Sequence, residues 1–229
     1  MLFDLLYILT SLLGFLIISL IAIWYKSNRM INIYLLVIFL LLSIKFLIHG
    51  LIDLKIFTFI NHDNISYFPF FSIGIPSLYL YFKNLVNDTK TFNKKELKHF
   101  IFPVLLGFCN LFLDKFYILS FYSSFILYSI FIIFHSFYIF LSFQFLKKNI
   151  WQRKAELFNA DQQNNLLIKW TTFLFIFSCL ISLRLLVSLS LGVMNHRYTY
   201  GQNYQWISAI LLDLIYIKIL SSPQILYGY

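Results

Sequence analysis

Charged residues are scarce in this sequence. Only 12% of its 229 residues are Asp, Glu, Lys or Arg, whereas a typical soluble domain carries about 25%. Apolar residues make up 60% of the chain, so too few charges are present to cover a water-facing globule of this length. These proportions exclude a soluble globular protein and predict that lipid covers much of the surface.

Cysteine and catalytic motifs are also scarce. Cys109 and Cys179 are the two cysteines, and both lie in apolar stretches, so we expect packing residues rather than a disulfide framework. The sequence contains no Gly-rich phosphate loop, Ser/His/Asp arrangement or acidic magnesium cluster. No His or Cys pair has metal-ligand spacing within a helix. We therefore expect no enzyme activity, no metal and no cofactor.

The net charge of +9 is distributed in a way that argues against nucleic-acid binding. Basic chains often bind phosphate groups, but here Lys and Arg lie in short loops between apolar runs. Cytoplasmic loops of membrane proteins are basic in this way. The lipid bilayer is thus the predicted partner.

Seven apolar runs predict an all-α polytopic membrane protein that forms one seven-helix transmembrane bundle over residues 1–229. A helix needs about 20 apolar residues to cross the hydrocarbon core. The run at 99–113 is short for a crossing. Aromatic residues at expected interfaces support the assignment: Trp24, Tyr67, Trp170 and Trp206. The predicted spans are 5–24, 31–51, 67–86, 99–113, 117–146, 171–193 and 206–220.

The loop charges predict the orientation, because cytoplasmic loops contain an excess of Lys and Arg. With the N-terminus outside, 13 Lys and Arg residues fall on the inner side and three on the outer side. The outer three are Lys55, Lys115 and Arg197. The bias towards Phe, Ile, Tyr, Lys and Asn suggests an AT-rich bacterial genome. We therefore predict a multi-pass protein of the bacterial cytoplasmic membrane, with its C-terminus in the cytoplasm.

Five ionisable residues within the predicted spans are candidate ligand-binding residues. Each such group costs about 2.5–3.5 kcal/mol at mid-membrane on insertion scales, so it needs a partner or a role. Lys45 and His49 lie one helical turn apart, although Lys45 could instead extend to the interface. Arg184 and Asp213 could form a buried ion pair that only fixes helix packing, or one that lines an outward-facing cavity. His135 is the fifth candidate.

Two further features concern single helices. His135 shares a helical face with Tyr128, Tyr138 and Ser142, and this polar stripe is expected to point into the bundle. A hydrogen bond from His135 to a neighbour is favoured over metal ligation. Gly74 and Pro76 lie within the third predicted span and predict a kink, which we treat as a hinge hypothesis.

Three stretches carry a family resemblance: KSNRMINIYLLVIFLLLSIKFLIHGL (26–51), PSLYLYFKNLVNDTKTFNKKELKHFIFPVL (76–105) and YQWISAILLDLIYIKILSSPQILYGY (204–229). They resemble the membrane-spanning N-terminal sensor region of bacterial AraC-type helix-turn-helix transcriptional regulators. The middle stretch resembles a span with LYLY that leads into a basic loop and then HF-x-x-P. Together the three cover about a third of the chain.

The resemblance implies a seven-span sensor that relays a small-molecule or membrane signal to a cytoplasmic C-terminal DNA-binding domain. This chain lacks the helix-turn-helix units, so contact with DNA is expected only through that missing domain, and a homodimer is implied by analogy. The alternative is a small transporter of an unknown solute, although the two three-span repeats of one such fold are not found. A retinal-binding light sensor is disfavoured because Lys218 lies near the inner end of its span.

Overall fold

The structure is a computed structural model, which describes residues 2–23, 29–56, 68–89, 91, 93–115, 121–152, 162–195 and 204–223. These residues form helices and short connections, with no strand among them. Four helical segments are long and apolar enough to cross a membrane: Phe3–Ile23, Ile31–Asp53, Ser129–Trp151 and Asn165–Gly192. The prediction of an all-α protein with membrane-spanning helices is confirmed to this extent.

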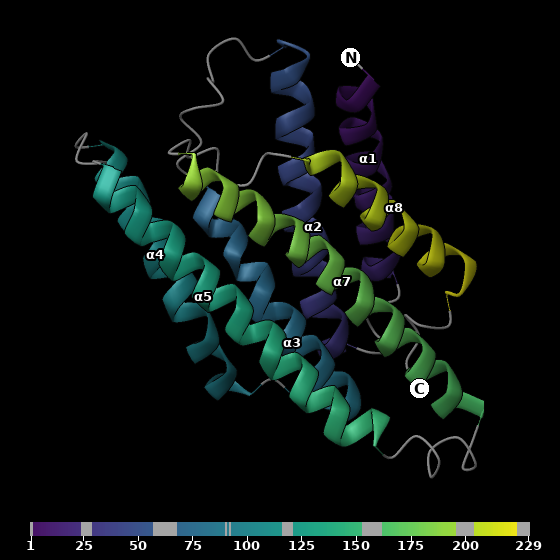
Figure 1. Cartoon of the computed structure of the whole chain (residues 1–229). Helices are drawn as coiled ribbons and strands as arrows, with labels where there is room; N and C mark the ends of the chain where they lie inside the picture. The colour runs from purple at the N-terminus through teal and green to yellow at the C-terminus, as the bar shows by residue number, and fades with distance from the viewer. Residues whose placement is uncertain are drawn as a thin grey trace.

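The described part of each predicted apolar run is helical (Figure 1). Short 3₁₀ segments, η2 (Phe68–Ile73) and η3 (Lys94–Leu97), precede α3 and α4, and a π-helical segment, η4 (Lys147–Trp151), continues α5. The described part of the chain contains seven longer helices: α1 (Leu2–Ile23), α2 (Arg29–Asp53), α3 (Gly74–Val86), α4 (Lys98–Lys115), α5 (Phe121–Leu146), α7 (Gln162–Met194) and α8 (Gln205–Ser221).

Six of these helices form a closed ring. Each helix contacts the next in the order α1, α2, α3, α5, α7 and α8, and α8 in turn contacts α1. Consecutive helices run in opposite directions along the bundle (Figure 1). The remaining helix, α4, packs against η2, and its Phe102 ring lies 4.8 Å from that of Phe134 on α5. The ring leaves an interior that five helices share, and α4 lies at its periphery.

The outer faces of the helices are apolar at helical spacing. On α1 the exposed side chains include Leu5, Leu9, Leu12 and Leu16, which recur every three or four residues. In water such a stripe would be unfavourable by about 25 cal/mol for each Å² of apolar surface. Lipid removes that penalty, because hydrocarbon chains are as apolar as leucine. These faces agree with the membrane character expected from the composition.

The interior of the bundle contains large aromatic side chains, including one that we expected at a membrane interface. Trp170 was predicted at a membrane interface, but it is fully buried and its Nε1 donates a 2.7 Å hydrogen bond to the Tyr81 hydroxyl. The polar atom of the indole therefore has a protein partner and needs no interfacial water. Trp206 is half-buried and stacks on Phe3 at 5.6 Å. Trp24 and Tyr67 lie outside the described residues.

The predicted kink at Gly74 and Pro76 has a different form in the structure. The described part of the third span is 3₁₀-helical over η2 and becomes α-helical at Gly74. Pro76 therefore lies in the first turn of α3, where its missing N–H removes no hydrogen bond from the helix. The hinge hypothesis therefore concerns the junction between the 3₁₀ segment η2 and the α-helix α3, not a kink within one helix.

The sixth predicted span is shorter than the helix that contains it. The apolar run begins at 171, whereas α7 begins at Gln162. Apolar run length measures the hydrocarbon thickness that a helix can cross, not the length of the helix itself. The polar first turns of α7 therefore extend the helix beyond the predicted span.

Candidate functional site

A cavity of about 140 Å³ lies inside the ring of helices. Its lining residues come from α2, α3, α5, α7 and α8, with Phe71 of η2 at one side. An engineered protein cavity of about 150 Å³ binds benzene, so a space of this size can hold a small molecule. Because the cavity is formed by helices far apart in the sequence, its shape depends on how those helices pack.

Three of the five candidate residues line this cavity. Lys45 comes from α2, His135 from α5 and Arg184 from α7. These positions are 90 and 49 residues apart along the chain (135 − 45 and 184 − 135). The structure therefore brings together groups that the sequence could only identify one helix at a time.

His135 is the most unusual group in the cavity wall. Its side chain is only 6% exposed, and neither ring nitrogen has a hydrogen-bond partner among the described residues. The Phe131 ring stacks on it at 6.2 Å. The expected hydrogen bond to a neighbour is thus not found, although Tyr138 and Ser142 of the same polar stripe also line the cavity. The side chain of Tyr128 lies outside the described residues.

Lys45 lies inside the bundle rather than at its edge. It is only 8% exposed and lines the cavity, so it does not extend to an interface as the alternative interpretation required. Arg184 donates from Nε to Ser208 Oγ of α8 at 2.9 Å. The positive charges of Arg184 and Lys45 act on each other. Two cations, one on α2 and one on α7, thus line the same small space.

The other two candidate residues lie outside the cavity lining. His49 is buried on α2, and it has an interaction partner. Asp213 accepts a 3.0 Å hydrogen bond from Thr10 of α1 at Oδ2, while its Oδ1 has no hydrogen-bond partner among the described residues. The expected ion pair with Arg184 is therefore not what Asp213 forms. This hydrogen bond connects α8 to α1, and Asp213 is not among the residues that line the cavity.

The remaining lining is mostly apolar and contains no acidic residue among the described side chains. Leu, Ile and Phe side chains from all five helices supply most of the wall. The described part of the chain also contains no group of three or more His, Cys, Asp or Glu side chains that could bind a metal ion. The described lining thus combines two cationic side chains with a mostly apolar wall.

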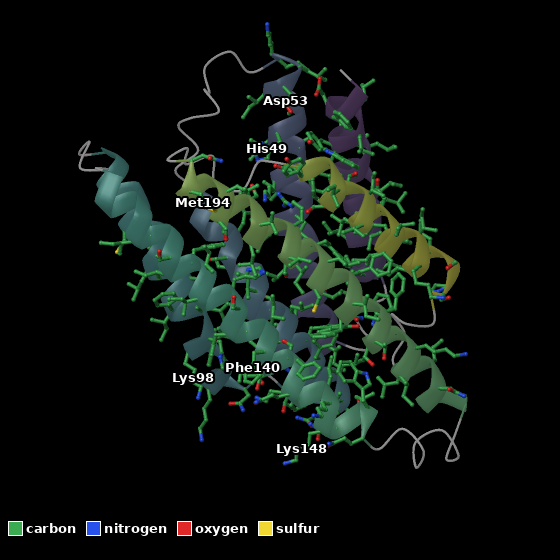
Figure 2. The ribbon with its side chains drawn as sticks, in the orientation of Figure 1. His49, Asp53, Lys98, Phe140, Lys148 and Met194 are labelled. Atoms are coloured by element: carbon green, nitrogen blue, oxygen red, sulfur yellow. The ribbon has the colours of Figure 1, made fainter. Side chains whose placement is uncertain are left out.

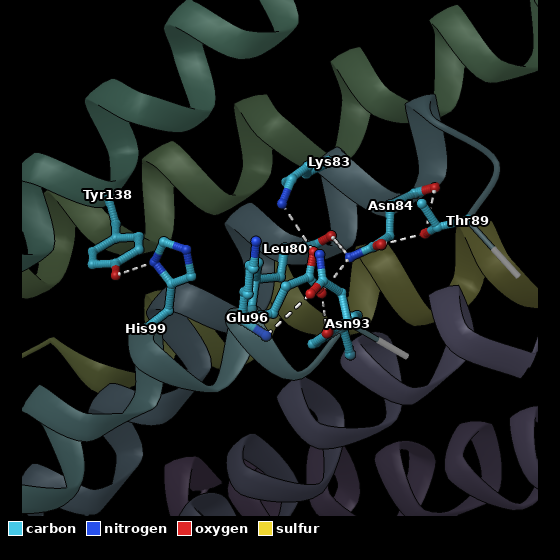
Figure 3. Close-up of polar contacts among 10 residues, drawn as sticks. Leu80, Lys83, Asn84, Thr89, Asn93, Glu96, His99 and Tyr138 are labelled. Carbon is cyan, nitrogen blue, oxygen red and sulfur yellow. Dashed lines mark hydrogen bonds and ion pairs between the residues drawn. The ribbon is translucent and has the colours of Figure 1, made fainter. Parts of the chain in front are cut away.

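A second polar cluster, centred on Glu96 of η3, lies near the end of α3 (Figure 3). Glu96 accepts hydrogen bonds from the Tyr34 hydroxyl at 2.5 Å, from Lys83 Nζ at 2.9 Å and from Asn84 Nδ2 at 3.1 Å. Asn84 in turn accepts a hydrogen bond from the Thr89 hydroxyl. The cluster joins α2, α3 and η3 in one network. The sequence-based candidates did not include it, although Glu96 is the single acidic residue between Lys90 and Lys98.

The hydrogen bonds determine the charge state of Glu96. Burial alone would raise the pKa of this carboxyl, but the three hydrogen bonds and the charge of Lys83 together lower it below its ordinary value. A carboxylate that accepts several hydrogen bonds is stabilised in its ionised form. Glu96 is therefore a buried, ionised group that connects the loop to two helices.

Tyr138 connects the cavity wall to α4. It lines the cavity, and its hydroxyl lies 2.8 Å from His99 Nδ1 on α4 (Figure 3). The ring of Tyr79 on α3 lies 5.7 Å from His99 and 6.0 Å from Tyr138. A movement of Tyr138 in the cavity wall would therefore alter its contact with His99 at the start of α4.

Replacing His135 with leucine is expected to raise the free energy of unfolding by about 1–2 kcal/mol, since a buried polar group without a partner is unfavourable. His49→Leu is the matched control, because His49 is equally buried at 6% but has a partner. Thermal unfolding in detergent would compare the two variants. A stability loss in His135→Leu as large as that in His49→Leu would show that His135 has an energetically important partner.

Known proteins give no match: no family model, no curated protein and no solved structure matches this chain.

Proposed function

We propose that the chain is the signal-receiving membrane domain of an AraC-type DNA-binding transcriptional regulator. A small molecule enters the central cavity and changes how α8 packs, and α8 relays the change to a C-terminal helix-turn-helix domain in the cytoplasm. The observation that carries this proposal is the cavity itself, which Lys45, His135 and Arg184 line together with mostly apolar side chains. The resemblance of three stretches to such regulators supports it.

Seven spans are part of the proposal, three of them beyond the four long apolar segments. At 1.5 Å per residue, the 18 residues of α4 and the 17 of α8 are roughly 27 and 26 Å long, close to a hydrocarbon core of about 30 Å. Helix α3 is shorter, but η2 extends it. Both α4 and α8 have outward apolar faces, formed by Ile101, Leu105 and Phe108 on α4 and by Ile210, Leu214 and Ile217 on α8.

The proposed orientation, with the N-terminus outside and the C-terminus in the cytoplasm of a bacterium, is supported by the charges at the two ends of the bundle. Lys98 and Lys148 lie at one end in Figure 2, and His49, Asp53 and Met194 lie towards the other. The positive-inside rule assigns the lysine-rich end to the cytoplasm. Helix α8 runs towards that end, since α7 before it runs away from it (Figure 1).

A sensor needs an element that differs between two states, because a ligand shifts a protein only by binding one state better. Helix α8 meets this requirement, since Ser208, Leu212 and Ile215 line the cavity. Ser208 also accepts the hydrogen bond from Arg184 of α7. A ligand that takes the Arg184 guanidinium as its own partner would change this contact between α7 and α8.

The experiment joins an AraC-type DNA-binding domain after Tyr229 and measures transcription from the promoter that this domain recognises. A panel of small molecules is expected to change the output of the unaltered fusion. The Arg184→Met fusion is expected to lose that response. Alkaline phosphatase joined at the same point should stay inactive, since it folds only in the periplasm. A response that Arg184→Met leaves intact, or an active phosphatase, would contradict the proposal.

Transport is the alternative function, and one observation favours it: intramembrane cations often mark a substrate path, and two of them line this cavity. A transporter must move its ligand across the membrane, whereas a sensor only needs to bind it. Uptake into proteoliposomes separates the two. Saturable binding without uptake supports the sensor, and concentrative uptake supports the transporter.

A further inference from the structure

The charges that line the cavity have one sign. Lys45 and Arg184 both face it, and no described residue of the lining is acidic. Asp213, the acid of α8, is directed towards Thr10 on α1 instead. Like charges in a medium of low dielectric constant repel strongly. An anion placed against both side chains would replace that repulsion with two attractions.

His135 adds an unused hydrogen-bonding group to the same space. Its ring nitrogens have no partner among the described residues, and the charge of Lys45 acts on this ring. A neutral imidazole has one N–H donor and one acceptor nitrogen. The donor can bind an oxygen of an anion that already contacts Lys45. A buried imidazole whose nitrogens have no described partner, in the same lining as two cations, is an arrangement that favours an anion.

The rest of the wall is mostly apolar and disfavours a fully polar anion. Leucine, isoleucine and phenylalanine side chains, among them Leu35, Phe39, Leu174 and Leu212, face the same space. Inorganic phosphate has no apolar part to set against them, and burying its unpaired oxygens would be unfavourable. The wall suits a ligand with a charged end and a hydrocarbon end.

The volume limits how long the hydrocarbon end can be. A space of about 140 Å³ is slightly smaller than one that takes benzene, so the ligand has about six non-hydrogen atoms. Butanoate has that size. A long-chain fatty acid has the same headgroup, but most of its chain would have to remain outside the cavity.

We propose that the cavity binds a monocarboxylate with a short alkyl chain, with its carboxylate against Lys45 and Arg184 and within reach of His135. The alkyl chain lies among the leucine and phenylalanine side chains of α2, α7 and α8. This assignment rests on the proposed sensor function, because it names the class of signal that the same cavity receives.

The test measures butanoate binding by calorimetry to the whole chain in lipid nanodiscs. Butanoate is expected to bind saturably, and neutral butanamide at least tenfold more weakly. Lys45→Met and Arg184→Met should each weaken butanoate binding about tenfold or more, the usual loss for a hydrogen bond to a charged group. Lys45→Arg should retain most of the affinity, and this variant keeps the test valid if a methionine variant misfolds. Lys218→Met, which removes a cation outside the cavity lining, should bind as the unaltered chain does.

Several results would overturn the assignment. They are absent butanoate binding, equal binding of butanamide, tighter binding of inorganic phosphate or dodecanoate than of butanoate, and methionine variants that bind normally. The transcription fusion separates this failure from that of the sensor function. Butanoate binding without a transcriptional response would leave the ligand class standing and reject the sensor. A response to another molecule, lost in Arg184→Met, would support the sensor and reject the ligand class.

Discussion

Replacing Glu96 with alanine is expected to lower the free energy of unfolding by about 3 kcal/mol. The substitution removes the acceptor of three hydrogen bonds at once, and each bond to a charged group contributes about 1.5–3 kcal/mol when counted alone. The loss is smaller than the sum because Lys83 is 31% exposed and can find water. Tyr34 and Asn84 are buried and cannot. Chemical unfolding in detergent micelles measures the change.

Two controls separate the charge of Glu96 from its shape. Glu96→Gln retains an acceptor oxygen and is expected to lose about half as much stability as Glu96→Ala, whereas Lys95→Ala on the exposed side of η3 should change stability by less than about 0.5 kcal/mol. If Glu96→Ala behaves like Lys95→Ala, the network contributes nothing to stability.

Acidic pH should have the same effect as the glutamine substitution. The folded state lowers the pKa of Glu96 below its ordinary value of 4.5, so its stabilising contribution is fully present above that value. It is lost as the pH falls below 4.5 and through the lower pKa of the folded state. Unfolding curves of Glu96→Gln should lack this contribution to the acid dependence. An equal acid dependence in both proteins would contradict the assignment.

Apolar run length was sufficient to predict where the helices lie. The run at 31–51, for example, lies within α2, because a lipid-covered helix must be apolar along most of its length. The junction between η2 and α3 was not predictable in the same way. Gly74 and Pro76 indicated a disturbance in the helix, but either a kink or a change of helix type would satisfy that pattern.

The candidate site was predictable as single residues but not as a set. Their positions within apolar runs identified Lys45, His135 and Arg184, because an ionisable group in hydrocarbon is unfavourable unless it has a partner or a function. The same criterion also selected Asp213, which bonds to Thr10 on a helix 203 residues away in sequence. Which groups line the same cavity depends on the order of helices in the ring, and that order cannot be read directly from the sequence.

The Glu96 cluster was missed for a related reason. In a basic loop a single glutamate resembles a solvated residue, and its partner Tyr34 is 62 residues away on another span. Burial of Glu96 results from the way η3 folds against α2 and α3, which is a tertiary effect. An unusual residue in a uniform segment, here an acid among lysines, was the only available signal.

Replacing Gly14 with leucine is expected to lower the free energy of unfolding by about 3 kcal/mol, at the upper end of the cost of overpacking a core. Gly14 of α1 lies against Ser43 of α2 and Tyr216 of α8. A Cβ atom added there would lie 1.9 Å from Ser43 Oγ and 2.7 Å from the Tyr216 hydroxyl. Both of these side chains are fully buried, so neither can move aside into lipid. Small residues at such crossings let membrane helices approach closely.

Gly74→Ala is the matched control, because a Cβ atom there meets only Leu41 at 4.0 Å. That variant should be neutral or slightly more stable, since alanine favours a helix over glycine by about 0.5–1 kcal/mol. Gly14→Ala should be destabilised less than Gly14→Leu, and adding Ser43→Ala should recover part of the loss, because it removes the nearest atom. Unfolding of the unaltered chain, Gly14→Ala, Ser43→Ala and the double variant under one condition gives the coupling energy between positions 14 and 43. Independent effects at the two positions would mean that α1 and α2 do not meet there.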